Sequence, residues 1–229
     1  MKVFDLWDNN VRIVLTDKSD GNMRAIETSD ADEVARNQNA LLDSLDLSPS
    51  QVARILSTYD TDNFIEYIKL DSVGPYDIPN AESMPRSDGI LTPTKDLGMF
   101  LPLADCLGIV LFDPAHSALM TVHSGRHNLE QYGAQKAVEF MRQEIGSDPK
   151  SILAWFSPSA GKHNYPMYKF NNHSLEEVAL EQLARSGVPE NNVILSSVDT
   201  TTNDSYFSHS SGDHSKRFAI LALMPKRKP

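Results

Sequence analysis

Cys106 and His123 carry the most specific chemistry in this sequence. Cys106 is the only cysteine, and His123 follows it by 17 positions. Two short apolar runs, 107–112 and 118–123, are typical of strands, and the turn-forming sequence 113–117 lies between them. An antiparallel hairpin brings the start of its first strand and the end of its second strand to the same edge. The sequence therefore predicts a thiol and an imidazole at one end of a sheet.

Two kinds of chemistry are open to such a pair. The thiol can act as a nucleophile with the imidazole as its base. The same two side chains can instead be two ligands of a zinc ion, with an open position for water or phosphate. A third interpretation is an inert core cysteine, because free cysteine is often buried.

The histidines weigh against copper. A multicopper oxidase needs about ten histidines, many of them in His-x-His pairs. This chain has seven histidines and no such pair, so we expect no copper. His127 follows His123 at a helical metal-ligand spacing, but Ser124-Gly125 indicates a turn between them. We therefore treat His127 as a candidate substitute ligand or substrate contact, and the alternative is a surface position at the start of the next helix.

Three polar stretches, 71–89, 157–173 and 199–216, are predicted to be long loops, and such loops are often functional. If the site binds phosphate, it needs cationic side chains or N–H donors. The backbone N–H groups of 157–161 are candidates. The predicted side-chain contacts are Arg126, Lys162, His163 and Arg217.

The elements that position these residues are mixed strands and helices. Strands are predicted over 11–15, 65–70, 100–103, 107–112, 118–123, 152–156, 193–195 and 218–223. Helices are predicted to begin at Ser29, at Ser48 and at about Asn128, with a fourth over 175–183. Their order does not alternate strictly, which favours an α+β fold of mixed β-sheets layered with helices. We expect a single domain over 1–229, with a basic tail at 225–229.

Composition limits the partners. The net charge is −10 and the pI is about 5.1, so we expect no nucleic acid to bind. The longest apolar run, Phe218–Met224, is far short of a membrane span. No signal peptide is visible, and one cysteine fits a reducing compartment. We expect a cytoplasmic protein that acts on a small molecule without membrane contact.

The residues around the pair resemble a known signature. Ala104-Asp105-Cys106-Leu107, followed by His123-Ser124-Gly125, resembles the pattern T-A-D-C-x-P with H-A-G-W-R-G about seventeen residues later. That signature belongs to the laccase-domain family, also labelled multicopper polyphenol oxidoreductase. Its bacterial members are described as peptidoglycan-editing factors and as purine nucleoside phosphorylases. Further segments are similar in order along the chain: 30–45, 87–92, 156–161, 206–208 and 216–217.

The resemblance implies a third site residue, and the chain departs from it there. The family has a histidine at a strand end, where this sequence aligns Asp71. A catalytic and zinc-binding set of Asp71, Cys106 and His123 is therefore expected, because aspartate can also ligate zinc. Two further departures are Arg126-His127-Asn128 in place of Trp-Arg-Gly, and Ser210-Ser211 in place of an arginine pair. The chain thus resembles a divergent member.

Three functions remain open at this stage. The resemblance implies a zinc-dependent purine nucleoside phosphorylase or an adenosine deaminase-like enzyme, with a purine nucleoside and phosphate as its substrates. The alternative is a metal-free cysteine hydrolase that acts on an amide, in which Asp71 orients His123. The third is a non-catalytic relative that only binds.

Overall fold

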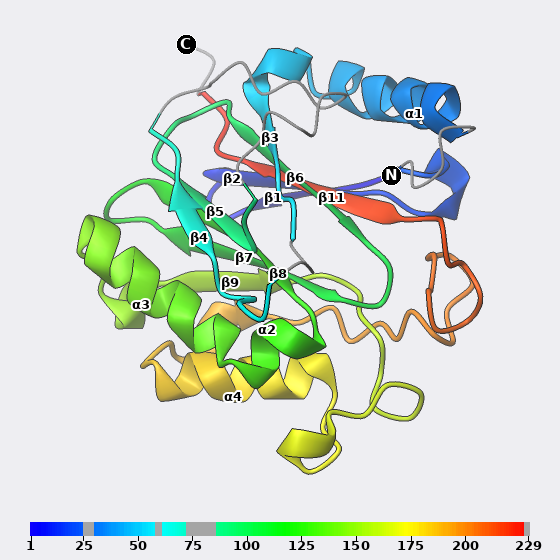
Figure 1. The fold of residues 1–229 in the computed structure, drawn as a ribbon. Helices are drawn as coiled ribbons and strands as arrows, with labels where there is room; N and C mark the ends of the chain where they lie inside the picture. The colour runs from blue at the N-terminus through cyan, green and yellow to red at the C-terminus, as the bar shows by residue number, and fades with distance from the viewer. Residues whose placement is uncertain (25–29, 58–60, 72–85, 227–229) are drawn as a thin grey trace.

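Two β-sheets lie face to face, and helices cover the outer face of each (Figure 1). The computed structural model describes residues 1–24, 30–57, 61–71 and 86–226. Helix α1 lies over the five-stranded sheet, and α2, α3 and α4 lie over the six-stranded sheet (Figure 1). This layered arrangement is the α+β fold predicted from the sequence.

The five-stranded sheet has the order β1-β2-β11-β6-β3. Its strands are β1 (Lys2–Leu6), β2 (Val11–Leu15), β11 (Phe218–Leu223), β6 (Gly98–Leu103) and β3 (Val52–Arg54). Only the β3–β6 pair is parallel. The last strand, β11, thus lies in the middle of the sheet.

The six-stranded sheet has the order β10-β9-β7-β8-β5-β4. Its strands are β10 (Val193–Ile194), β9 (Leu153–Phe156), β7 (Leu107–Asp113), β8 (Ala118–Ser124), β5 (Gly89–Thr92) and β4 (Tyr67–Lys69). The two outer pairs, β10–β9 and β4–β5, are parallel, and the inner pairs are antiparallel.

The four α-helices of the described residues are α1 (Ala31–Asp43), α2 (Arg126–Glu130), α3 (Gly133–Ile145) and α4 (Leu175–Arg185). Ser174 begins α4 with a capping box, in which its side chain accepts from the backbone of Glu177 and the Glu177 side chain accepts in return. None of the described helices is long and apolar enough to cross a lipid bilayer.

Alternating apolar side chains account for the layers. In β11, Phe218 and Ile220 belong to the core between the sheets, whereas Ala219 and Leu221 pack with α1. Because side chains alternate between the two faces of a strand, a strand that is apolar at every position needs cover on both faces.

The structure corrects several predicted elements. The helix predicted to begin at Ser48 is one short 3-10 turn, Pro49–Gln51, followed by β3. The helix predicted from about Asn128 is two helices, because Tyr132 between them has a left-handed φ of 62°. Strands β1, β3 and β5 were not predicted. The predicted helix start at Ser29 and the end of the basic tail, 227–229, lie outside the described residues.

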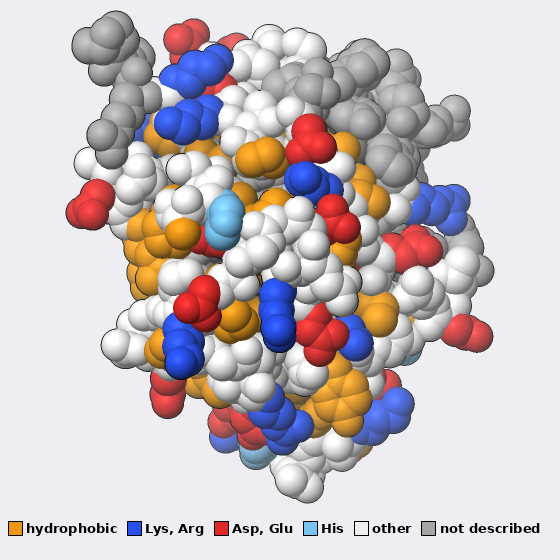
Figure 2. All heavy atoms as spheres, turned by 90° about the vertical axis from the view of Figure 1, so that its left-hand side faces the viewer, with side chains coloured by type: hydrophobic (Ala, Val, Ile, Leu, Met, Phe, Trp, Pro, Cys, Tyr) orange, Lys and Arg blue, Asp and Glu red, His pale blue; other side chains and the backbone are white. Residues whose placement is uncertain are grey.

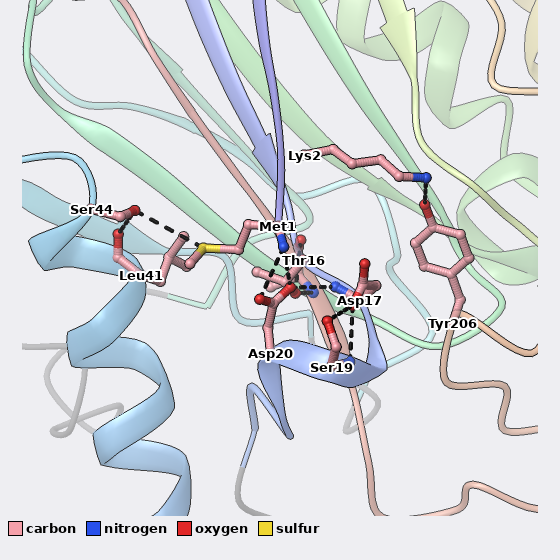
Figure 3. A network of polar contacts seen from close by, with 10 residues as sticks. Met1, Lys2, Thr16, Asp17, Ser19, Asp20, Leu41, Ser44 and Tyr206 are labelled. Carbon is pink, nitrogen blue, oxygen red and sulfur yellow. Dashed lines mark hydrogen bonds and ion pairs between the residues drawn. The ribbon is translucent and has the colours of Figure 1, made fainter.

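A capped turn, Lys18–Asp20, follows β2 (Figure 3). The Asp17 carboxylate accepts from the backbone N–H of Ser19 at 2.9 Å, and the Asp20 carboxylate accepts from that of Asp17 at 2.9 Å. Nearby, the Lys2 ammonium donates to the Tyr206 hydroxyl at 3.2 Å (Figure 3). These bonds fix the path of the chain just before Asn22 and Arg24.

Candidate functional site

Cys106 and His123 lie together at one end of the six-stranded sheet. In the β7–β8 hairpin, Gly108 is opposite His123. A β-carbon on Gly125 would lie 3.0 Å from Cys106 Sγ and 3.7 Å from His123 Nε2. The thiol and the imidazole therefore border the same point, and glycine at 125 leaves that point open.

Asp105 fixes the backbone that presents Cys106. It is buried and has a left-handed φ of 77°. Its carboxylate accepts from the Thr200 hydroxyl at 2.8 Å and from the Ser210 N–H at 2.7 Å, and its carbonyl accepts from the Ala160 N–H at 2.8 Å. These three bonds tie two loops to the start of β7, so Asp105, which also borders the hollow beside Cys106, positions the site.

Burial sets the protonation states of the pair. Burial, together with the positive charges of Arg24 and Arg217, lowers the pKa of His123 to about 4. Burial, together with the negative charge of Asp105, raises the pKa of the Cys106 thiol to about 11. At neutral pH the site therefore holds a neutral thiol and a neutral imidazole, rather than a thiolate and an imidazolium.

Two arginines from distant parts of the chain line a hollow of about 330 Å³ beside this pair. Asn22 Oδ1 accepts from the backbone N–H of Arg24 at 3.1 Å and from that of Arg217 at 2.9 Å. The N–H of Met23 also donates to the Arg217 carbonyl at 2.8 Å. The two arginines are thus held as neighbours, which suits the binding of an anion. Arg217 was predicted from the sequence, whereas Arg24 was not, because no spacing marks it.

A second hollow, of about 130 Å³, lies on the other side of the pair. It is partly aromatic: the rings of Phe64 and His127 stack with centroids 4.7 Å apart, and the Arg126 guanidinium lies 4.4 Å from the Tyr165 ring centroid. The predicted contacts Arg126 and His127 both line this hollow. The two hollows share Ser57, Cys106, His123 and Tyr165, so together they form one cleft with the pair at its centre.

Asp88 is the buried acid of the second hollow. It is 1% exposed, and its backbone carbonyl accepts from the His123 N–H at 2.7 Å. Its Oδ2 accepts from the Glu66 N–H at 3.2 Å, while its Oδ1 has no hydrogen-bond partner in the described part of the chain. Burial is the main reason that the pKa of Asp88 rises to about 6. The sequence analysis noted 87–92 only as a similar segment and missed the role of this side chain in lining the cleft.

Asp71 does not join Cys106 and His123, which corrects the predicted three-residue site. It follows β4, where Lys69 is opposite Leu91 of β5, and Leu91 is opposite Met120 of β8. The chain therefore runs toward the far end of the sheet from His123. The Asp71 side chain is 69% exposed and lies 3.3 Å from the Lys69 ammonium.

Ser57 lies beside Cys106 and His123, where Asp71 does not. Ser57 follows β3 in the other sheet and borders both hollows. The prediction for Asp71 is wrong because the direction of β4 relative to its neighbouring strands cannot be read from the sequence.

Lys162 and His163 also lie away from the pair. Both line a separate hollow of about 340 Å³, and the Lys162 ammonium pairs with the Glu177 carboxylate at 2.8 Å. The backbone N–H groups of 157–161 are not available to phosphate either. Each of them donates within the protein, to Gly108, Val198, Asp105 or Asp199, and Pro158 has none. The predicted phosphate contacts in this loop are therefore corrected.

A larger hollow, of about 590 Å³, contains none of the predicted site residues. It lies between β4 and α3 and is lined by charges of both signs, among them Glu66, Lys136 and Glu139. Figure 2 shows this face, where acidic and basic side chains are interspersed. Size alone therefore does not mark the site, whereas the gathering of Cys106, His123 and the arginines does.

The donor set at the cleft does not fit zinc. A catalytic zinc ion usually has three protein ligands, and Cys106 and His123 are the two donors at the centre of the cleft. Asp88 and His127 line its second hollow but form no three-residue group with them. In the described ranges, no group of three His, Cys, Asp or Glu side chains is arranged to hold a metal ion. Arg24 and Arg217 further make this end of the cleft unfavourable for a second cation.

Comparison with known families identifies the chain. A family model described as multi-copper polyphenol oxidoreductase laccase matches residues 17–173, well over half of the sequence. The chain belongs to this family, as the residues around Cys106 and His123 implied.

Two curated proteins are similar to the chain in sequence, and one crystal structure is similar to it in fold. The chain is 20% identical to a purine nucleoside phosphorylase of Bacteroides thetaiotaomicron over 67% of its length, and 26% identical to one of Corynebacterium glutamicum over 69%. These matches cover 58% and 60% of the relatives, so the chain spans about three fifths of their length. The crystal structure of the hypothetical protein YfiH of Bacillus licheniformis has the same fold, with a TM-score of 0.81 at 19% identity over 95% of this chain and 94% of that one.

Proposed function

We propose that this protein cleaves purine nucleosides by phosphorolysis in the cleft around Cys106 and His123. The observation that carries the proposal is the pair Arg24 and Arg217, whose backbone N–H groups both donate to Asn22 and whose side chains line one hollow of the cleft. An anion held there would be next to a second, partly aromatic hollow of a size that suits a flat ring. The names of the relatives from Bacteroides thetaiotaomicron and Corynebacterium glutamicum support the same substrate class.

In the proposed reaction, one oxygen of phosphate bonds to C1′ of the ribose while the bond from C1′ to the base nitrogen breaks. The electron pair leaves with the base, which takes up the proton that the attacking phosphate gives up, and the products are the free base and ribose 1-phosphate. Arg24 and Arg217 would hold the phosphate and neutralise its charge. Phe64, His127 and Tyr165 would stack around the base.

Cys106 and His123 lie where the two hollows meet, so the ribose would lie against them. In their neutral forms both side chains can hydrogen-bond to ribose hydroxyl groups. Their pKa values argue against the amide hydrolase, which would need a thiolate as nucleophile. Because the donor set does not fit zinc, the proposal contains no metal-dependent step.

Incubation of the full-length protein with inosine or adenosine, with and without inorganic phosphate, tests the proposal. We expect release of the base and ribose 1-phosphate only when phosphate is present. Release of base at the same rate without phosphate, release of ammonia alone, or no turnover of either nucleoside would contradict it.

Two variants assign the roles. Arg24→Met should raise the KM for phosphate by about tenfold or more, because a charge-assisted contact to the anion is lost. The matched control is Arg185→Met, which removes an exposed arginine that pairs with Glu181 on α4. Cys106→Ala should reduce kcat by about a hundredfold while the protein still unfolds cooperatively.

A further inference from the structure

The second hollow contains a buried acceptor that the fold leaves unused. Asp88 is 1% exposed, and it lines this hollow together with Phe64 and His127. Its Oδ2 is held by the Glu66 N–H, which fixes the carboxylate at one oxygen. Its Oδ1 has no partner among the described residues. A buried acceptor without a partner destabilises a protein, so it calls for an explanation beyond folding.

The neighbouring acceptor gives a useful contrast. Asn128 lines the same hollow, and its Oδ1 also has no partner in the described ranges. However, that oxygen is directed at Gly133, where an added β-carbon would overlap it. The Asn128 amide donates to the Phe64 carbonyl at 2.7 Å and to the Tyr67 hydroxyl at 3.1 Å. Asn128 therefore builds the wall of the hollow, and Asp88 remains as its acceptor for a ligand.

We propose that Asp88 determines the base specificity of the cleft: its Oδ1 accepts a hydrogen bond from the exocyclic amine of a bound 6-aminopurine. This inference rests on the proposed function and extends it to the substrate. A carboxylate oxygen only accepts hydrogen bonds, so an amine at this position of the base is favoured and a carbonyl oxygen is repelled. The enzyme should therefore prefer adenosine to inosine.

The hydrogen bond from the Glu66 N–H allows a single substitution, Asp88→Asn, to invert the preference between adenosine and inosine. In the Asp88→Asn variant, the Glu66 N–H requires an oxygen at the place of Oδ2, so the amide NH₂ takes the place of Oδ1. The variant then offers a donor to the base where the wild type offers an acceptor. Purine riboside, which has only hydrogen at the corresponding ring carbon, neither gains nor loses a bond.

The test is the kcat/KM of the wild type and of Asp88→Asn for adenosine, inosine and purine riboside, each with saturating phosphate. We expect the adenosine-to-inosine ratio to fall by about tenfold or more, and purine riboside to change by less than about threefold. The matched control is Glu66→Gln, which removes the neighbouring charge but lines a different hollow and should leave the ratio unchanged. An unchanged ratio in Asp88→Asn, or an equal loss for all three nucleosides, overturns the inference.

A binding measurement separates this inference from the proposed function. If the wild type turns over none of the nucleosides, phosphorolysis is refuted, and calorimetric titration with adenosine and inosine then decides the role of Asp88. Tighter adenosine binding that is lost in Asp88→Asn would support the inference without the reaction. Absence of any preference in the wild type would overturn it.

Discussion

Two aspartates lie at opposite ends of the six-stranded sheet. Both are buried, but they differ in the number of hydrogen bonds that their carboxylates accept and in the direction of their pKa shifts. Asp113 ends β7 and is fully buried; its carboxylate accepts from the Ser147 hydroxyl, the His116 ring, and the backbone N–H groups of Ala115 and His116. Asp88 precedes β5 at the cleft end and has one partner at one oxygen.

Their pKa values follow this difference. Burial raises the pKa of Asp113, but the hydrogen bonds from Ser147 and His116 outweigh burial, and the net shift is downward. For Asp88 burial prevails, and the pKa rises to about 6. The same residue type at the same depth thus stabilises a turn at one end of the sheet and, at the other end, has an acceptor without a partner among the described residues. Such a division is expected where a binding site is built at the expense of stability.

The largest expected effect is the loss of the Asp113 carboxylate. Asp113→Ala leaves buried donors without a partner and should lower the free energy of unfolding by about 3 kcal/mol. Urea denaturation at pH 7 measures this. Because the pKa of Asp113 is lowered in the folded protein, its contribution is present above its ordinary value of 3.8 and is lost as the pH falls through the folded value. A variant as stable as the wild type at pH 7 would remove the contrast between the two aspartates.

The opposite sign is expected at the other end of the sheet. Asp88→Asn removes a buried charge and should raise the free energy of unfolding by about 1–2 kcal/mol at pH 8. Because the folded pKa lies above 3.8, the wild type loses stability as the pH rises through about 6. The gain should therefore vanish near pH 4, and urea denaturation at both pH values tests this. Destabilisation at pH 8 would mean that the carboxylate has a structural partner.

Gly125→Ala is expected to change the free energy of unfolding less than the two aspartate variants do, but to reduce turnover clearly. A β-carbon there would lie 3.0 Å from Cys106 Sγ, closer than such contacts normally allow, so the thiol has to shift from His123. Gly125→Ala should reduce turnover about tenfold, with a change in unfolding free energy below about 1 kcal/mol. Ser124→Ala is the matched control, because its buried hydroxyl has no partner in the described structure. Equal activity of the two variants would show that the position of the thiol does not matter.

No effect at all is expected from metal removal. Because no three donors among the described residues are arranged to hold a metal ion, the purified protein should contain much less than one zinc per chain. A chelator should change neither the melting temperature nor turnover. Elemental mass spectrometry and thermal unfolding test this. One zinc per chain, lost in Cys106→Ala, would show that a further ligand completes the cleft.

The sequence was informative wherever neighbours in space are also neighbours along the chain. The hairpin of β7 and β8 follows from two apolar runs and one turn, and it correctly brings Cys106 and His123 to the same sheet end. The helix faces of α1, α3 and α4 follow from periodic apolar residues in the same way.

The rest depended on contacts that no local pattern encodes. Arg24 is brought beside Arg217 through Asn22, which lies 195 positions from Arg217 in the sequence. Asp71 was misplaced because β4 is parallel to β5, so the beginning of β4, and not its end, lies near the cleft. Lys162 has a cationic side chain but is paired with Glu177, which only the three-dimensional structure reveals.

The last strand in the chain, β11, lies between β2 and β6, so the cleft can be completed only after the end of the chain has been synthesised. A nascent polypeptide exposes β2 and β6 on the ribosome well before β11 emerges to pair with both. During that interval each of the two strands has an unpaired edge. Such edges can be bound by chaperones or can pair wrongly with other chains. Asn22 gains its second N–H donor, and Arg24 its neighbour, only when Arg217 arrives just ahead of β11. The proposed anion site therefore forms only with the insertion of this strand, and a translation product that stalls before it would lack that site as well as being prone to aggregate.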